Sequence, residues 1–492
     1  MAFSAPGADV WQPLPRTAWT AAAARHLLLR AGWTARREEV ERAVNEGLDA
    51  TLARLFPVEP RSLPKPAAIE RLERELPGFL AAARAARGAE KRMAQQEMRE
   101  RSQAALQELR VAWLQWAAKP ENAAAAKWVL FLSDVYVVSA DKVKNASFIW
   151  QHFETLATHG LGPAPVLTKA VSRSPAMAMY LDLVRSGREA PNENFARELF
   201  ELFVLGEGNY SEADVKEAAR AFTGYRIEPA SGKFRFARRQ HDDGEKTIFG
   251  RTGRFGGDDL IDLAYEQRAA ATFLPAQLAR WYLADEPLPV KTLDELSEGW
   301  RVSGFDLGVL ARTFFGSRGF YAPEFRGNLI KAPVQFYLGL LSDLELDVTP
   351  LPRHSAARLR LMGQSLFQPP NVRGWVGGRA WINSSTLAVR RQLVQQLFTP
   401  IREDTLTADE QRVVAEARER GADRFTVSDA WIEARAQLGP EEWVETLLGD
   451  RAGETMRREW TRFLSDGNAE TRNDRMRAAL IALLQTPEYQ LC

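Results

Sequence analysis

Acidic, amide and basic side chains gather on one predicted helix between residues 191 and 206. At about 100° per residue they share one sector of the helix, and apolar residues fill the opposite sector. Such a face is either a solvated ladder of ion pairs or the wall of a cleft where carboxylates transfer protons or bind a divalent metal. The residues of the polar sector are Glu193, Asn194, Arg197, Glu198 and Glu201.

A second polar cluster follows a predicted β-hairpin at residues 225–240, where helical spacing gives way to alternation around Pro229-Ala230-Ser231-Gly232. The hairpin leads into a turn that carries His241, Asp242 and Lys246. A histidine followed directly by carboxylates suits acid–base chemistry, although a turn rich in Asp and Gly is equally consistent with a structural role. No second cluster of strands is expected.

A third group lies on a Gly-rich loop at residues 368–381, which carries Trp375, Arg379 and Trp381. Tryptophans on a rigid loop either stack on a sugar or peptide or anchor the loop in the core.

These groups combine into one hypothesis of a catalytic cleft. Its catalytic residues are Glu198, Glu201, His241 and Asp242, with His241 and Glu201 in one pocket. The metal is unknown, because no standard metal-binding spacing is present, and a divalent ion remains an alternative. The substrate-binding residues are Asn194, Arg197, Lys246, Trp375, Arg379 and Trp381.

Motifs along most of the chain, including residues 192–224 and 241–246, resemble one bacterial family. The other motifs are Arg25-His26-Leu27-Leu28-Leu29-Arg30-Ala31-Gly32-Trp33, Val138-Ser139-Ala140-Asp141-Lys142-Val143-Lys144, Pro175-Ala176-Met177, Gly363-Gln364-Ser365-Leu366-Phe367, Pro369-Pro370-Asn371-Val372-Arg373-Gly374-Trp375 and Thr486-Pro487-Glu488-Tyr489-Gln490-Leu491-Cys492. Together they resemble the domain-of-unknown-function family 1800. The resemblance implies a largely helical protein, often encoded beside a secreted phosphatase- or sulfatase-like protein, and it brings no established activity.

The chain departs from this family at one place. Where relatives usually have Phe-Trp-His-Asn-His-Phe, it has Phe131-Leu132-Ser133-Asp134-Val135-Tyr136, so both histidines are replaced. Any chemistry that the histidines perform in relatives is either lost here or rebuilt around Asp134. Because a lone carboxylate in an apolar run needs a partner, we expect Asp134 to pair with Arg197 or Lys142.

Helical spacing dominates the elements that must position these groups. We predict a mainly α fold, with a large helical domain, one small β-hairpin and an irregular Gly- and Trp-rich loop. The predicted parts are an N-terminal helical segment (1–64), a charged helical arm (65–119) broken at Pro77-Gly78, a helical core (120–400) with the hairpin near 225–240 and the loop near 368–381, and a C-terminal helical segment (401–492).

The composition disfavours several classes of protein. With 65 basic and 64 acidic residues the net charge is +1, so no overall field favours nucleic acid. Cys492 is the single cysteine, which excludes an intramolecular disulfide and a multi-thiolate metal site. No apolar run reaches the roughly 18 residues of a membrane span. Without a recognisable signal peptide we expect a cytoplasmic protein, although unconventional export would leave no trace.

Three functions fit these features. The first is a helical enzyme of hydrolase or lyase type, and it is slightly favoured. The second is a non-catalytic assembly or chaperone-like partner of a co-encoded phosphatase- or sulfatase-like protein, acting through the helical arm. The third is a carbohydrate- or peptide-binding protein that uses the Trp-rich loop.

Overall fold

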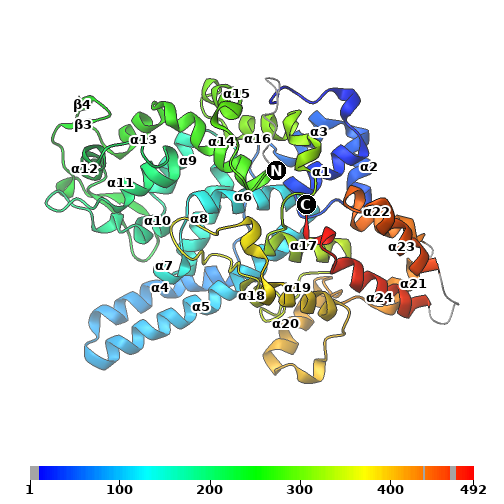
Figure 1. Cartoon of the computed structure of the whole chain (residues 1–492). Helices are drawn as coiled ribbons and strands as arrows, with labels where there is room; N and C mark the ends of the chain where they lie inside the picture. Colours follow the sequence, from blue (N-terminus) through cyan, green and yellow to red (C-terminus); the bar gives the residue numbers. More distant parts are fainter. Residues whose placement is uncertain (1–9, 436–437, 466–471) are drawn as a thin grey trace.

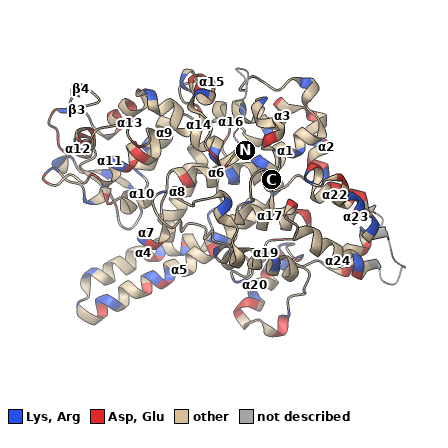
Figure 2. Cartoon of the chain, viewed as in Figure 1, with Lys and Arg blue, Asp and Glu red and all other residues tan. Residues whose placement is uncertain are grey.

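The computed structural model describes residues 10–435, 438–465 and 472–492. It is mainly helical with small antiparallel hairpins, which confirms the predicted fold class (Figure 1). None of the helices in the described ranges combines the length and hydrophobicity needed to cross a bilayer. Figure 2 shows basic and acidic residues interspersed over most of the helices.

Helix α6 (Ala123–Val135) lies at the centre of the molecule, and nearly all of its side chains are buried. It packs against α1 (Ala21–Ala31), α5 (Gly88–Ala118), α8 (Ala146–His159) and α14 (Arg268–Tyr282). A helix with apolar residues on all its faces must be surrounded by other elements, and apart from Lys127, Ser133 and Asp134 every side chain of α6 is apolar.

Helices α9 to α13 and the hairpins form one end of the molecule (Figure 1). The helices of this end, together with α7 beside them, are α7 (Ala140–Val143), α9 (Ala164–Ser172), α10 (Pro175–Tyr180), α11 (Asn194–Glu198), α12 (Glu212–Ala221) and α13 (Gly257–Tyr265). A capping box starts α12, because the Ser211 side chain accepts the backbone N–H of Asp214 and the Asp214 side chain accepts that of Ser211.

The predicted hairpin is present as β1 (Tyr225–Ile227) and β2 (Phe234–Phe236). A second hairpin, β3 (Lys246–Ile248) and β4 (Arg251–Gly253), was not expected. It forms because Phe249 and Gly250 both take positive φ, which gives a tight two-residue turn. The expectation of a single strand cluster is therefore wrong.

The helices from the two chain ends lie together at the opposite side of α6 (Figure 1), where Arg25 pairs with Glu445 at 2.6 Å. Residues from all four predicted segments share one hydrophobic cluster. The remaining helices are α2 (Arg37–Glu46), α3 (Leu48–Leu55), α15 (Val290–Val302), α16 (Leu307–Gly316), α17 (Pro333–Asp343), α18 (Ala356–Leu361), α19 (Ser384–Leu397), α20 (Ala408–Glu419), α21 (Asp429–Ala434), α22 (Pro440–Leu447), α23 (Glu454–Ser465) and α24 (Arg472–Leu484).

Helix α4 (Ala67–Ala85) and the first half of α5 form a projecting arm, at the lower left of Figure 1. No residue from 77 to 101 is buried, so the tip packs only on itself. The predicted break at Pro77-Gly78 is wrong, because α4 continues through both residues. Pro77 is exposed, so water can satisfy the carbonyl group that its missing N–H leaves unpaired.

Replacing a large side chain by alanine should have very different effects on stability in the two halves of α5. Trp113 is fully buried between Trp33 and Trp116, so Trp113→Ala should lower the free energy of unfolding by about 3–5 kcal/mol. Met93 on the arm is 70% exposed, so Met93→Ala should change it by less than about 0.5 kcal/mol. Urea denaturation of both variants measures the difference, and similar losses would contradict this placement of α5.

Candidate functional site

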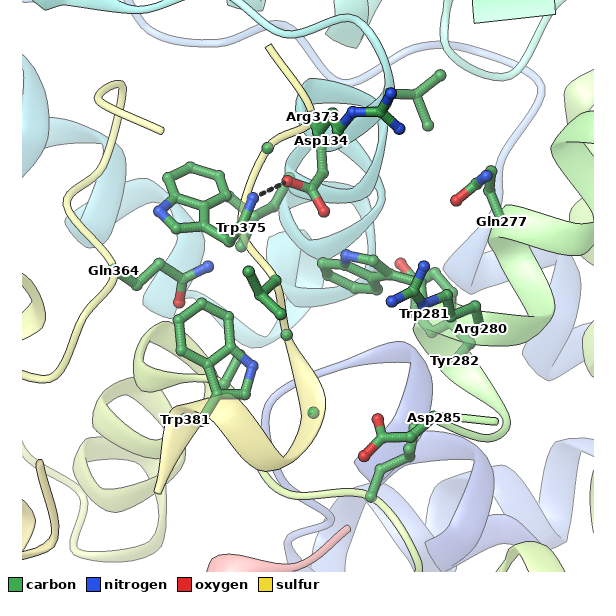
Figure 3. Close-up of a pocket in the computed structure, with 18 of the residues that line it drawn as sticks. Asp134, Gln277, Arg280, Trp281, Tyr282, Asp285, Gln364, Arg373, Trp375 and Trp381 are labelled. Carbon is green, nitrogen blue, oxygen red and sulfur yellow. Dashed lines mark hydrogen bonds between the residues drawn. The ribbon is translucent and has the colours of Figure 1, made fainter. Parts of the chain in front are cut away.

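The Gly-rich loop at residues 368–381 contacts a carboxylate at the end of α6. The backbone N–H of Trp375 donates a hydrogen bond of 2.9 Å to Oδ1 of Asp134 (Figure 3). Gly374 has a φ of 74°, and a Cβ atom at this position would overlap the Asp134 carboxylate. Only glycine allows the loop to come so close.

The same arrangement recurs a few residues further along the loop, at the end of α14. Here the backbone N–H of Arg379 bonds to the carboxylate of Asp285. Gly378 has a φ of 53°, and a Cβ atom there would overlap Asp285. Two glycine–carboxylate contacts therefore hold the loop at two points.

A cavity of about 610 Å³ lies beside this loop, which is a usual size for a small-molecule site. Four tryptophans line it: Trp33, which follows α1, Trp281 from α14, and Trp375 and Trp381 from the loop. Figure 3 shows the last three. Trp375 and Trp381 are 8% and 9% exposed, so they both anchor the loop and face the cavity. Gln277 and Gln364 add amide groups to the lining.

Asp134 also lines the cavity, and its side chain is half-buried. Burial raises the pKa of Asp134 to about 7, although hydrogen bonds from Trp375 and Trp281 and the nearby charge of Arg280 favour the ionised form. An ordinary aspartate has a pKa of about 3.9. Near neutral pH Asp134 can therefore either donate or accept a proton.

The predicted ion pair of Asp134 is wrong. Lys142 instead pairs with Asp182 at 2.7 Å, and Arg197 pairs with Glu212 at 2.7 Å. Asp134 is stabilised by a backbone N–H and an indole, which satisfy the carboxyl group without neutralising its charge.

Glu201 reaches the cavity from a π-helical turn, Leu199–Val204, that continues α11. Such turns interrupt the regular helical spacing and are frequent at functional sites. Glu201 accepts hydrogen bonds from the Tyr210 hydroxyl at 2.9 Å and from Arg373 at 2.7 Å. Arg373 also pairs with Glu207 at 2.6 Å, so these carboxylates give the loop a third attachment.

The other residues of the same polar sector do not line this cavity. Arg197 pairs with Glu193 at 3.2 Å as well as with Glu212, which joins α11 to α12. Burial and then the neighbouring Glu201 raise the pKa of Glu198. The backbone N–H of Asn194 bonds to the side chain of Asn192. The interpretation as a solvated ladder of ion pairs therefore fits the rest of the polar sector, and Glu201 is the one residue of the sector that lines the cavity.

The turn at residues 241–246 forms a separate cluster of its own. Nδ1 of His241 lies 2.8 Å from the carbonyl oxygen of Thr223, and Arg220 pairs with Asp242 at 2.7 Å. This guanidinium lowers the pKa of Asp242 to about 2. The buried Lys246 donates to the carbonyl oxygens of Asp242 and Gly244.

These contacts tie the turn to α12, and none of its residues lines the cavity that contains Glu201. The predicted pocket shared by Glu201 and His241 is therefore wrong. Across the residues that the structure describes, no group of three or more His, Cys, Asp or Glu side chains could hold a metal ion.

Sequence reasoning missed several residues of the cavity. Trp281 and Asp285 lie at the end of a helix whose apolar residues are typical of a core, and Arg373 lies in a motif used only for the resemblance. The isolated carboxylate of Asp134, together with Glu201, Trp375 and Trp381, was the signal in the sequence that pointed to this cavity.

Two glycines with nearly equal φ angles isolate the effect of the Asp134 contact. Gly377 has a φ of 73°, a ψ of −172° and no atom within reach of an added Cβ, so Gly377→Ala should destabilise the protein by about 1–3 kcal/mol through its backbone conformation alone. Gly374→Ala adds the overlap with Asp134 and should destabilise it by about 1–3 kcal/mol more. Equal free energies of unfolding for the two variants would contradict the contact.

The raised pKa of Asp134 predicts how stability varies with pH. Between about pH 4 and 7 the folded protein holds a proton that the unfolded chain has lost, so the contribution of Asp134 to stability falls as pH rises through this window. Asp134→Asn cannot titrate, so the stability of the wild type relative to this variant should fall by a few kcal/mol across the window. Unfolding measurements at several pH values test this, and a constant difference is the contrary result.

Comparison with known proteins gives one finding. The model of a family described as a protein of unknown function (DUF1800) matches residues 26–491, nearly the whole chain. No curated protein and no solved structure gives a significant match. The chain therefore belongs to the DUF1800 family.

Proposed function

We propose that this protein is an enzyme of hydrolase or lyase type whose active site is the Trp-lined cavity, with Asp134 as the group that transfers a proton. The observation that carries the proposal is the position of Asp134, half-buried in the cavity lining together with four tryptophans. The pKa of Asp134, near 7, supports it, because a proton-transfer group works best when its pKa is close to the working pH.

The lining favours a polyhydroxyl, sugar-like ligand. The faces of Trp281, Trp375 and Trp381 can stack on the C–H face of a ring, and the amides of Gln277 and Gln364 can bond to hydroxyl groups. In this arrangement Asp134 donates a proton to a leaving oxygen, or accepts one from a hydroxyl or a water. Glu201 and Arg373 hold the loop over the ligand.

The departure from the family motif lies at the same cavity. Val135, one of the two positions where the resemblance implies histidine, lines it beside Asp134. The other position, Ser133, is buried and bonds to the carbonyl oxygen of Leu130. In this chain Asp134 is thus the titratable residue at the cavity end of α6.

Activity against a panel of oligosaccharides tests the proposal. Asp134→Asn should lower turnover of a substrate by about 100-fold or more while keeping its binding. Trp281→Ala should weaken binding by about tenfold through the loss of stacking. The control is Trp150→Ala, because Trp150 is also partly exposed but packs beside Lys65, away from the cavity.

Full turnover by Asp134→Asn would contradict the catalytic role. Binding that is equally strong in the wild type and in Trp281→Ala would contradict the ligand position.

A second candidate function is assembly with a co-encoded phosphatase- or sulfatase-like protein. The arm formed by α4 and α5 favours it, because residues 77–101 project without any buried contact (Figure 1). Replacing these residues with a short turn should abolish co-elution of the two proteins in size-exclusion chromatography and leave the fold intact. Unchanged co-elution would contradict a role for the arm.

A further inference from the structure

Two basic side chains in the lining of the cavity are buried far from water. Arg30 from α1 is 1% exposed and Lys127 from α6 is 4% exposed, yet both border the cavity. Buried Lys and Arg side chains are normally paired with carboxylates, because an isolated charge is poorly stabilised in a protein interior. The hydrogen-bond partners of Arg30 and Lys127 therefore show whether a negative charge is paired with them in this part of the cavity.

Every hydrogen-bond partner of Arg30 is neutral. Its guanidinium donates to the carbonyl oxygens of Tyr282, Leu283 and Phe325 and to the side chain of Asn328. Its Nε–H is buried and has no partner at all.

Lys127 has the same kind of surroundings. Its Nζ donates to the carbonyl oxygens of Leu29 at 3.3 Å and Gly32 at 2.9 Å. An ammonium group has three N–H donors, so these two carbonyl groups leave one without an oxygen acceptor. The rings of Trp33 and Tyr282 lie 5.9 and 5.8 Å from Nζ, and neither ring carries a charge. No carboxylate in the described part of the chain forms an ion pair with Arg30 or Lys127.

Burial lowers the pKa of both side chains, and it lowers that of Lys127 to about 7. Cys492 and the half-buried Asp285 also line the cavity. Cys492 raises the pKa of both side chains and Asp285 raises that of Arg30, whereas the charge of Arg30 lowers the pKa of Lys127. An anion that enters the cavity and meets both side chains supplies the missing charge partner.

We infer that Arg30 and Lys127 form an oxyanion subsite of the cavity, so that its ligand carries a carboxylate, phosphate or sulfate group. The inference rests on the proposed ligand cavity and narrows its substrate class from neutral to acidic sugars. The two side chains bind the oxyanion at one part of the cavity, and the tryptophans contact the ring.

Inorganic anions test the subsite without any sugar. Sulfate, phosphate and acetate, each compared with chloride at equal ionic strength, should raise the unfolding temperature of the wild type, and the strongest of them identifies the preferred oxyanion. The rise should be lost in Lys127→Met and in the polar variant Lys127→Gln. It should persist in Trp281→Ala and in the control Lys91→Met, because Lys91 is exposed on the arm.

Sugar binding by the wild type gives an independent readout, free of any effect of a variant on folding. Glucuronate, glucose 6-phosphate or glucose 6-sulfate, whichever carries the preferred group, should bind about tenfold or more tightly than glucose. Equal binding of glucose and its anionic forms would overturn the subsite and leave the sugar cavity standing. Binding of inorganic anions without any sugar binding would overturn the sugar cavity and leave the anion subsite standing. Equal anion effects in the wild type and both Lys127 variants would also overturn the subsite.

Discussion

The site depends on a close approach of a loop backbone to two carboxylates. Asp134 lies in the last turn of the central helix α6, and Asp285 follows α14, which also lines the cavity. Each carboxylate accepts a backbone N–H from the residue after a glycine with positive φ. Any Cβ at these glycines would push the loop away, so the shape of the cavity and the environment of Asp134 arise from the same contacts.

The contacts of Asp134 also determine its pKa. A carboxylate held by a salt bridge would have a low pKa and would stay ionised, as Asp242 does beside Arg220. Asp134 has hydrogen bonds without a full counter-charge, so burial dominates and its pKa rises. The loop therefore positions Asp134 and also leaves it able to exchange a proton near neutral pH. This is why we assign function to Asp134 and a structural role to the turn at His241.

The fold was largely predictable because its signals are local. Helical spacing, the capping box at Ser211 and the alternation around residues 225–236 depend on neighbours within a few residues. The site was predictable only in part. Glu201, Trp375 and Trp381 were identified and line the cavity, but His241 bonds to Thr223 and Asp242 pairs with Arg220, outside the cavity lining. The partner of Asp134 is a backbone group 241 residues away, which no spacing in the sequence could indicate.

Infrared spectroscopy measures the protonation state of Asp134 directly. The difference between spectra of the wild type and Asp134→Asn isolates the carboxyl band of this one residue. We expect the band of the protonated acid to disappear with a midpoint near pH 7. A midpoint near pH 4, the value of an aspartate in water, would contradict both the buried environment of Asp134 and its proposed part in proton transfer.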